Sequence, residues 1–587
     1  MTPHCRLSAL ALLLAAALLA SCASQPARRD AGARVALTWQ TLIDGKPARE
    51  VEMSAFARPA DARAPSHRFE GTLRLRGTVA TRTIHADSAY LAPAQIAAAR
   101  SFPADFAYDF VQDGDTLLPV KRGYLASNHP HWDLLLEPGR VWDEPGDHGD
   151  SRAALPFALV QKHMNCTHYG VLGFVFGDDG RISHAAVEIA SETCNYLKLD
   201  LWGLLDAEYT PHPVAAGDAV IAAWRANRAR RLPTRPIAQL ATDHPGLDPA
   251  RLVIGEAGAR TLHGMVINGV NYVSACSTRR GDYPYCDVLP FPSYSTAKSA
   301  VGALALLAMA QSNPGAQQLR LADYAPSPAC ETPEWADVTL RNLADMDSGH
   351  YDASGYMADE DAVKVQGFFG AASELGKATF ACVAYPRRAA PGEVWAYHTS
   401  ETFLLGDALG RYLRRLPGNA DADLFRDVVV GRVYAPLGLS ATARVSRRTS
   451  DAAAQALFGY GVQFHRDDIA RLADFIGNRH GAFDGTPVLD PALLDLALQR
   501  VPGQHGHAVT GYADFRYQLG FWARDVASLL NCRHPTWVPF MSGFGGISVV
   551  MFPNGFIYYN VADSGSAAAF DWSAAAVAAN TITPLCR

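Results

Sequence analysis

Ser295-Thr296-Ala297-Lys298 is the most informative stretch of this chain, and it stands directly before a long apolar run, residues 299–310. A serine and a lysine three residues apart share one face of a helix, so the lysine amine can take the proton of the serine hydroxyl. Because the run is apolar nearly all round, it predicts a buried helix that presents this pair at its N-terminus. The alternative is that Ser295 only caps that helix.

Lysine is rare in this chain and supplies only seven of its 52 basic residues. An arginine stays protonated in proteins and cannot accept a proton from a hydroxyl group. Lys298 therefore suits a reaction in which Ser295 is activated as a nucleophile, which is the chemistry of acyl transfer.

Further motifs follow from about residue 252 onward. They are a strand pair at 264–273, a helix at 338–349 that ends in Ser-Gly, the segment Pro391-Gly392-Glu393-Val394-Trp395-Ala396-Tyr397-His398-Thr399, the turn 435–439 and the late strand Gly543-Phe544-Gly545-Gly546. With the Ser-x-x-Lys pair, they resemble the serine β-lactamase and penicillin-recognising superfamily, in particular its class C-like branch of serine hydrolases and esterases. The resemblance implies an α+β fold over residues 252–587, with an antiparallel sheet flanked by helices and a helical subdomain.

The resemblance also implies a role for each matching residue. Ser295 would attack a carbonyl, while Lys298 and Tyr397 would share its proton, with either of them as the base. The backbone N–H groups of Ser295 and Phe544 would hold the oxyanion. The remaining substrate-binding positions would be Thr399, Ser542 and Gly543. No metal or cofactor is required, since nucleophile, base and oxyanion donors are all protein groups.

Two positions depart from the pattern of the family. Its Tyr-x-Asn is here Tyr397-His398-Thr399, so that a hydroxyl replaces an amide that both donates and accepts hydrogen bonds. Its Lys-Thr-Gly or His-x-Gly is here Met541-Ser542-Gly543, which has no cation at the first position.

The missing cation bears on the substrate. β-Lactams and D-alanyl peptides carry a carboxylate that this cation helps to bind. No lysine follows Lys377 in the chain, so only Arg533 or His534 could take its place. The segment 351–382, rich in aromatic residues, is predicted either to cover the pocket and favour an apolar acyl group or to be a packed surface loop.

We therefore expect a serine hydrolase that acts on a small-molecule ester, and less readily on an amide, through an acyl-enzyme on Ser295. A D,D-peptidase or β-lactamase that acts on cell-wall-related substrates is the first alternative, and an inactive binding protein that keeps the fold is the second. The formal charge of -6 and the pI near 6.3 carry no signature of a nucleic-acid partner. The sequence indicates no particular protein partner.

The start of the chain predicts its compartment. His4 and Arg6 precede an apolar run, residues 7–20, which is too short to span a bilayer and is typical of a secretory signal. The alternatives are an ordinary signal that is cleaved nearby and a buried hydrophobic helix.

The apolar run ends in Leu19-Ala20-Ser21-Cys22, which resembles the cleavage box of a bacterial lipoprotein. Residues 1–21 would then be a lipoprotein signal peptide, with Cys22 as the lipidated N-terminus of a flexible tether over 22–33. Since Ala23 rather than aspartate follows, the resemblance to lipoproteins of double-membraned bacteria favours the cell envelope, with the anchor in the outer membrane facing the periplasm or the exterior.

Eight cysteines remain after the signal and the lipid anchor are set aside, an even number that fits disulfides in an oxidising compartment. Eight thiols allow many connectivities, and the pairing of sequence neighbours is one of them. It gives the pairs Cys166 with Cys194, Cys276 with Cys286, Cys330 with Cys382, and Cys532 with Cys586. The competing hypothesis of a metal site is disfavoured, because the cysteines show no Cys-x-x-Cys spacing.

Residues 34–210 are predicted to form a mainly-β domain of unknown role, because short alternating runs such as 68–77 and 170–176 are broken by turn residues. They would form hairpins of an antiparallel sandwich or barrel. Residues 211–251 are expected to be a linker with one helix. Four histidines of the β domain, namely His129, His131, His163 and His168, are more typical of surface or core residues than of metal ligands.

Overall fold

The structure is a computed structural model. It describes residues 37–46, 51–77, 80–86, 92–103, 106–254, 259–565 and 569–586. All residues before Leu37, and with them the predicted signal peptide and Cys22, lie outside these residues. Among the described residues, no helix has the length and apolar character needed to cross a membrane.

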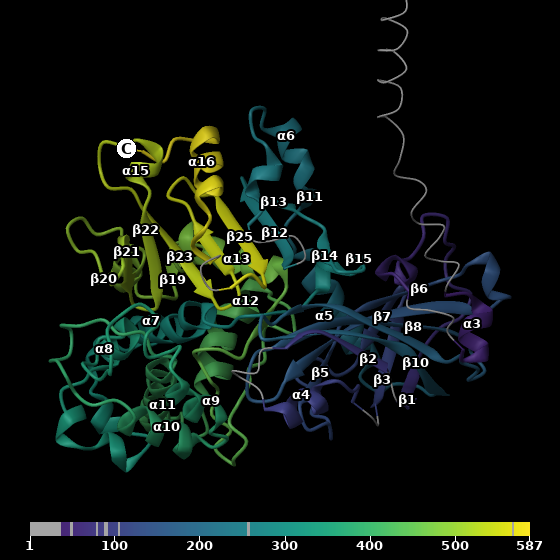
Figure 1. The fold of residues 1–587 in the computed structure, drawn as a ribbon, viewed down its shortest axis with the longest axis horizontal. Coiled ribbons are helices and arrows are strands. Elements are labelled where there is room, and N and C mark those ends of the chain that lie inside the picture. The colour runs from purple at the N-terminus through teal and green to yellow at the C-terminus, as the bar shows by residue number, and fades with distance from the viewer. Residues whose placement is uncertain are drawn as a thin grey trace, which may run out of the picture.

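A closed antiparallel sheet forms the N-terminal region, drawn in purple and blue in Figure 1. Its strands pair in a ring, because β10 binds β9 on one side and β1 on the other. The ring consists in spatial order of β1 (Gly71–Arg76), β3 (Phe106–Asp113), β4 (Thr116–Pro119), β6 (Gly139–Trp142), β7 (Ser151–Gln161), β8 (Thr167–Phe176), β9 (Ala185–Thr193) and β10 (Leu197–Pro211). Two further strands, β2 (Ala80–Ala86) and β5 (Trp132–Leu136), pair with β10 and β7. We call this region the N-terminal ring.

The N-terminal ring encloses its own apolar core, which includes Phe69, Phe110, Leu155 and Phe174. Alternate side chains of a strand point to opposite faces of the sheet, so a closed sheet buries one set inside. The largely β structure predicted for this region is confirmed.

A second, nine-stranded sheet lies in the C-terminal region, and all but one of its pairings are antiparallel. Its order is β11 (Thr234–Pro236), β13 (Val270–Val273), β12 (Arg260–Ile267), β25 (Ile557–Ala562), β24 (Ile547–Met551), β23 (Trp537–Gly543), β22 (Phe521–Asp525), β21 (Tyr512–Gln518) and β20 (His507–Val509). The predicted strand pair is thus present as β12 and β13, next to strands from the end of the chain.

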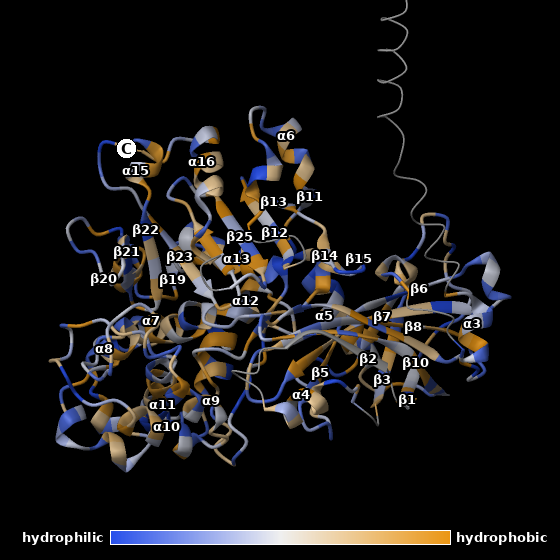
Figure 2. Ribbon diagram, in the orientation of Figure 1, coloured by the Kyte–Doolittle hydropathy of each residue, from blue (hydrophilic) through white to orange (hydrophobic). Residues whose placement is uncertain are grey.

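Helices flank this sheet and form a separate layer beside it, shown in green in Figure 1. Helix α13 (Arg466–Gly477) packs on β24 and β25, where apolar segments meet (Figure 2). The helical layer contains α8 (Leu340–Asp345), α9 (Gln366–Gly370), α10 (Glu374–Val383) and α11 (Thr399–Arg415). The sheet-plus-helices arrangement implied by the resemblance is confirmed.

The apolar run after Ser295 forms the predicted buried helix. It begins with a π-helical turn, Lys298–Ala303, and continues as α7 (Leu304–Ser312). Every residue from Lys298 to Ala310 is buried. The sequence did not predict the π-helical turn, a feature that is common at functional sites.

The segment 211–251 is more structured than the expected linker. It contains α5 (Gly217–Ala229) and α6 (Leu240–Asp243), and its strand β11 pairs in parallel with β13. Because β11 belongs to the second sheet, this segment is in part an element of the C-terminal region. The predicted division into domains stays a prediction.

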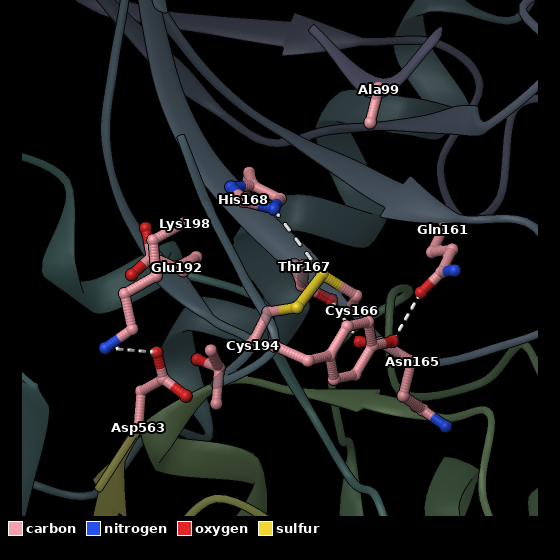
Figure 3. Close-up of a disulfide and its surroundings, with 12 residues drawn as sticks. Ala99, Gln161, Asn165, Cys166, Thr167, His168, Glu192, Cys194, Lys198 and Asp563 are labelled. Carbon is pink, nitrogen blue, oxygen red and sulfur yellow. Dashed lines mark hydrogen bonds and ion pairs between the residues drawn. A yellow bond between two sulfur atoms is a disulfide. The ribbon is translucent and has the colours of Figure 1, made fainter. Parts of the chain in front are cut away.

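The described residues contain four disulfides, and they are the four pairs of sequence neighbours. They join Cys166 to Cys194, Cys276 to Cys286, Cys330 to Cys382, and Cys532 to Cys586. The predicted pairing is confirmed. The first of them lies at the end of the N-terminal ring that contacts the C-terminal region (Figure 3).

Candidate active site

Ser295 and Lys298 are in direct contact at the start of the buried helix. The Nζ atom of Lys298 lies 2.8 Å from the Oγ atom of Ser295. The lysine side chain is buried, whereas Ser295 remains partly exposed. The hydroxyl is therefore open to a substrate on one side and bonded to an amine on the other, as a nucleophile with an adjacent base requires.

Burial lowers the pKa of Lys298 to about 8, although the negative charge of Glu360 opposes this decrease. The ammonium form is disfavoured because the site offers it little solvation. Near pH 8 a large part of the protein carries a neutral amine, which can accept the Ser295 proton.

Glu360 is a site residue that the sequence analysis did not predict. The Oγ1 atom of Thr399 accepts a hydrogen bond from Lys298 Nζ at 2.7 Å and donates one to the Glu360 carboxylate. The backbone N–H of Thr399 also donates to Glu360, at 3.0 Å. The only sequence signal was the acidic run 359–361 within the segment expected to cover the pocket.

The Thr399 hydroxyl thus replaces the amide of the family pattern as both donor and acceptor. The hydroxyl uses its accepting capacity on Lys298 and its donating capacity on Glu360. Thr399 therefore orients Lys298 and links it to a carboxylate at the first turn of α11, where a negative charge is favourable.

Tyr397 lies beside the pair, with its ring centroid 4.8 Å from Lys298 Nζ. Burial raises the pKa of Tyr397 well above its ordinary value, although a hydrogen bond to Ser295 opposes the increase. The phenol is therefore neutral at physiological pH and can pass a proton on. Of the two candidate bases, Lys298 is the better proton acceptor.

His398, between Tyr397 and Thr399, is buried against two carboxylates. Its Nε2 atom lies 2.9 Å from Asp359 and its Nδ1 atom 3.3 Å from Glu401. Burial would lower the pKa of His398, but the hydrogen bonds to Asp359 and Glu401 outweigh it and raise the value to about 9. The protonated His398 thereby holds residues 359–361 next to the start of α11.

The strand β23 approaches the nucleophile closely at Gly543. A Cβ atom at this position would lie 2.9 Å from the Ser293 carbonyl oxygen, so a side chain there would push the strand away. The next residue, Phe544, lies with Ser295 in the walls of two cavities. Phe544 is therefore next to the nucleophile, and its role as an oxyanion donor stays a prediction.

The family model for β-lactamase matches residues 273–553. These residues belong to the β-lactamase family. The match covers Ser295, Lys298, Tyr397 and Phe544, so the matched part of the chain is a serine-hydrolase domain of this family.

Solved structures of low sequence identity are similar to part of the chain. A putative 6-aminohexanoate-dimer hydrolase from Bacillus anthracis is 15% identical, covers 59% of this chain and 81% of its own, and has a TM-score of 0.42. A penicillin-binding protein homologue from Caulobacter crescentus is 17% identical, with coverage of 58% and 92% and a TM-score of 0.38. A family VIII carboxylesterase is 17% identical, covers 58% of this chain and 92% of its own, and has a TM-score of 0.39. No curated protein matched the chain.

Two cavities meet at Ser295 in the β-lactamase-family domain. The first, of about 30 Å³, is lined by Tyr397, Trp522 and Ser542 and is called the Tyr397 cavity below. The second, of about 110 Å³, is lined by Tyr460, Phe369 and Thr399 and is called the Tyr460 cavity.

The segment 351–382 contributes to both cavities of the β-lactamase-family domain. Tyr356 and Met357 line the Tyr397 cavity, whereas Glu360, Asp361 and Phe369 line the Tyr460 cavity. The prediction that this segment covers the pocket is confirmed, and the alternative of a packed surface loop is wrong.

Neither cavity is lined by a lysine, arginine or histidine within the described part of the chain. Met541, at the position of the family cation, is 0% exposed and lies in the hydrophobic core. Arg533 and His534 do not take its place, and His534 instead lines a separate groove of about 860 Å³. The carboxylates of Glu360 and Asp361 are the charged groups of the Tyr460 cavity.

The four histidines of the N-terminal ring lie apart from this site. Burial lowers the pKa of His131 to about 4 and that of His168 well below its ordinary value. Among the described residues, one group of three metal-ligand types gathers, His168 with Cys166 and Cys194, but those two cysteines form a disulfide. His129, His131 and His168 therefore behave as core residues, whereas His163 is exposed.

Proposed function

We propose that this protein hydrolyses neutral esters through an acyl-enzyme on Ser295. The observation that carries the proposal is the 2.8 Å contact between Lys298 Nζ and Ser295 Oγ, at a lysine whose pKa burial lowers to about 8. A hydroxyl in contact with a neutral amine is the minimum machinery for acylation.

The reaction follows from the positions of these groups. Lys298 takes the Ser295 proton while Oγ bonds to the carbonyl carbon, and the N–H groups of Ser295 and Phe544 receive the developing oxyanion. The proton then passes through Tyr397 to the departing alkoxide, which leaves as an alcohol. Water, deprotonated by the same groups, attacks the acyl-enzyme, and Ser295 recovers its proton as the acid leaves.

The charge of the site supports a substrate without a carboxylate. The cavities beside Ser295 present Glu360 and Asp361 and, within the described residues, no basic side chain. A substrate carboxylate would lose the charge-assisted hydrogen bond that a cation provides, about 1.5 to 3 kcal/mol. This favours esters over penicillins and D-alanyl peptides.

A catalytically idle binding protein is disfavoured by the same geometry. The amine of Lys298 contacts the hydroxyl of a partly exposed serine, a contact that a site used only for binding does not require. The contact from Lys298 to Ser295 and Thr399 has a clear use only when Ser295 reacts.

We also propose that the protein is exported and anchored in the outer membrane through a lipid on Cys22. The signal-like run before Cys22 supports this, and four disulfides are at home in an oxidising compartment. Cys22→Ser is expected to shift the protein from the membrane to the soluble fraction of the cell envelope. Unchanged fractionation of this variant contradicts the anchor.

The central experiment is the reaction of the purified protein with p-nitrophenyl esters and with a fluorophosphonate probe. We expect an acyl or phosphonyl adduct on the peptide that contains Ser295, and turnover of neutral esters with a higher kcat/KM than that of penicillins, cephalosporins or D-alanyl-D-alanine peptides. Ser295→Ala should abolish both. Full ester turnover by Ser295→Ala would falsify the proposal, and efficient cephalosporin turnover with esters untouched would favour a β-lactamase.

A further inference from the structure

The N-terminal ring reaches into the active site. Met164 and Asn165, in the turn between β7 and β8, line the Tyr460 cavity together with Ser295. Tyr196, in the turn between β9 and β10, lines it as well. These three residues precede the β-lactamase-family domain by more than 70 positions, so a region outside the family closes one side of the pocket.

These two turns are held in place by covalent and polar contacts. The Cys166–Cys194 disulfide joins them directly (Figure 3). The Tyr196 hydroxyl donates to the Gln161 side chain, and the Asn165 amide oxygen accepts a hydrogen bond from the backbone N–H of Gly461 at 3.3 Å. The wall is therefore rigid rather than a mobile loop end.

The ring also touches the residue that precedes the nucleophile. Tyr294 has a positive φ of 40°, which is unfavourable for a bulky side chain and requires support from its surroundings. Its hydroxyl donates to the backbone carbonyl of Thr193 at 2.8 Å, one residue before Cys194. The conformation that presents Ser295 is thus supported by the N-terminal ring.

Phe544 makes a second connection of the same kind. Its side chain packs against both the core of the N-terminal ring and the core beneath α7. The centroid of its aromatic ring lies 5.6 Å from that of Tyr294. Both residues expected to supply the oxyanion donors are therefore positioned next to the N-terminal ring.

Buried polar contacts fix the ring on the β-lactamase-family domain. The Glu137 carboxylate, 0% exposed, accepts a hydrogen bond from Thr442 and lies 3.2 Å from His465. Asp133 binds Arg447 in the same interface. Each carboxylate also pairs within the N-terminal ring, Glu137 with Arg122 and Asp133 with Lys162, so buried charge networks extend across this interface.

The chemistry decides which part of the substrate meets this wall. Tyr397 must give its proton to the leaving group, so the leaving group belongs on the side of Ser295 where the Tyr397 cavity lies. The acyl group then enters the Tyr460 cavity, where Met164, Tyr196 and Phe369 offer apolar surface.

We propose that Met164 and Tyr196 of the N-terminal ring form the acyl-binding wall of the hydrolase, so that the ring sets its selectivity for the length of an uncharged acyl chain. This inference rests on the ester hydrolysis proposed above. It gives the added region a role in substrate choice, while the proton transfers stay with the β-lactamase-family domain.

The test compares p-nitrophenyl acetate, butyrate and octanoate with three variants. Met164→Trp narrows the Tyr460 cavity and should lower kcat/KM for butyrate and octanoate about tenfold or more, while kcat/KM for acetate stays within about twofold. Met164→Ala widens the cavity and should shift the preference toward octanoate. Ile182→Trp is the matched control, because Ile182 is also partly buried on the core of the ring but follows β8 at its opposite end.

Each result has a distinct meaning. A changed chain-length profile in both Met164 variants, with the Ile182 control unchanged and all proteins labelled by fluorophosphonate at Ser295, supports the acyl-binding wall. Unchanged profiles in folded, fluorophosphonate-reactive Met164 variants overturn it and leave the proposed function intact. If the wild-type protein neither labels nor turns over any ester, the proposed function fails and this inference fails with it.

Discussion

Two buried lysines, Lys298 and Lys377, show what separates a catalytic amine from a structural one. Each is 2% exposed, and burial lowers the pKa to about 8 in the first, against an opposing effect of Glu360, and to about 7 in the second. Lys298 donates to the Ser295 and Thr399 hydroxyls. Lys377 donates to the Phe368 carbonyl and, at 3.2 Å, to the Tyr460 hydroxyl.

The comparison shows that a lowered pKa is not sufficient for a base. Lys377 has the greater pKa shift, yet its amine lies 4.5 Å from the Phe368 ring centroid and bonds to groups that do not react. Lys298 has a smaller shift and touches the nucleophile. Geometry therefore comes before the pKa in assigning the role.

The largest expected effect is on ester turnover, which should differ between variants of the two lysines. Lys298→Met should lower kcat/KM for a neutral ester about 10³-fold or more, because the Ser295 proton then has no acceptor. Lys377→Met, the matched control, should stay within about threefold. Steady-state kinetics on both folded variants measure the ratio, and similar losses in the two would remove the distinction.

Replacing Met541 by lysine would place an amine in a third buried environment, to be compared with those of Lys298 and Lys377. Met541 is fully buried and lies in the core, so its replacement by lysine buries an amine with no evident partner. Met541→Lys should lower the free energy of unfolding by about 3 kcal/mol or more, while Met541→Leu should change it by less than about 1.5 kcal/mol. Denaturant unfolding provides the measurement, and equal stability of the two variants would place residue 541 in contact with water.

The pH dependence of stability sharpens the comparison further. The pKa of Lys377 rises from about 7 in the folded state to its ordinary 10.5 on unfolding, so between these values the unfolded state binds more protons and stability increases with pH. This one group contributes up to about 1.4 kcal/mol per pH unit. Lys377→Met should lose that part of the slope, as urea unfolding at pH 7 to 10 can show. An unchanged slope would mean that Lys377 is not desolvated.

The smallest effect concerns Glu360, which distinguishes the surroundings of the two amines. Its negative charge raises the pKa of Lys298 against the effect of burial, so Glu360→Gln should lower that pKa. The acidic limb of the kcat/KM profile should then move to lower pH, by up to about one unit. Asp361→Asn is the control from the same cavity, and an equal shift in both variants would point to a general field effect instead.

The residues that we propose to carry the chemistry could be predicted because they lie in local motifs. Ser295 and Lys298 are three positions apart, and an apolar run after them can only be a buried helix, so their contact follows from helix geometry. The disulfides could also be predicted, since each joins cysteines that are neighbours in the sequence of cysteines. Glu360 could not, because it meets Thr399 across 39 residues of chain that include α9 and α10.

Local sequence patterns were enough to predict the nucleophile, two candidate bases and the strand-rich N-terminal region, because these depend on spacing, periodicity and turn residues. The order of the family motifs predicted the β-lactamase-like fold. The closure of the N-terminal strands into a ring and the approach of Met164 and Tyr196 to the pocket of Ser295 became apparent only in the folded chain. The tertiary structure also decided that Met541 is a core residue. The physical reason is that contacts between segments more than 100 residues apart arise from the packing of whole layers, which no local pattern encodes.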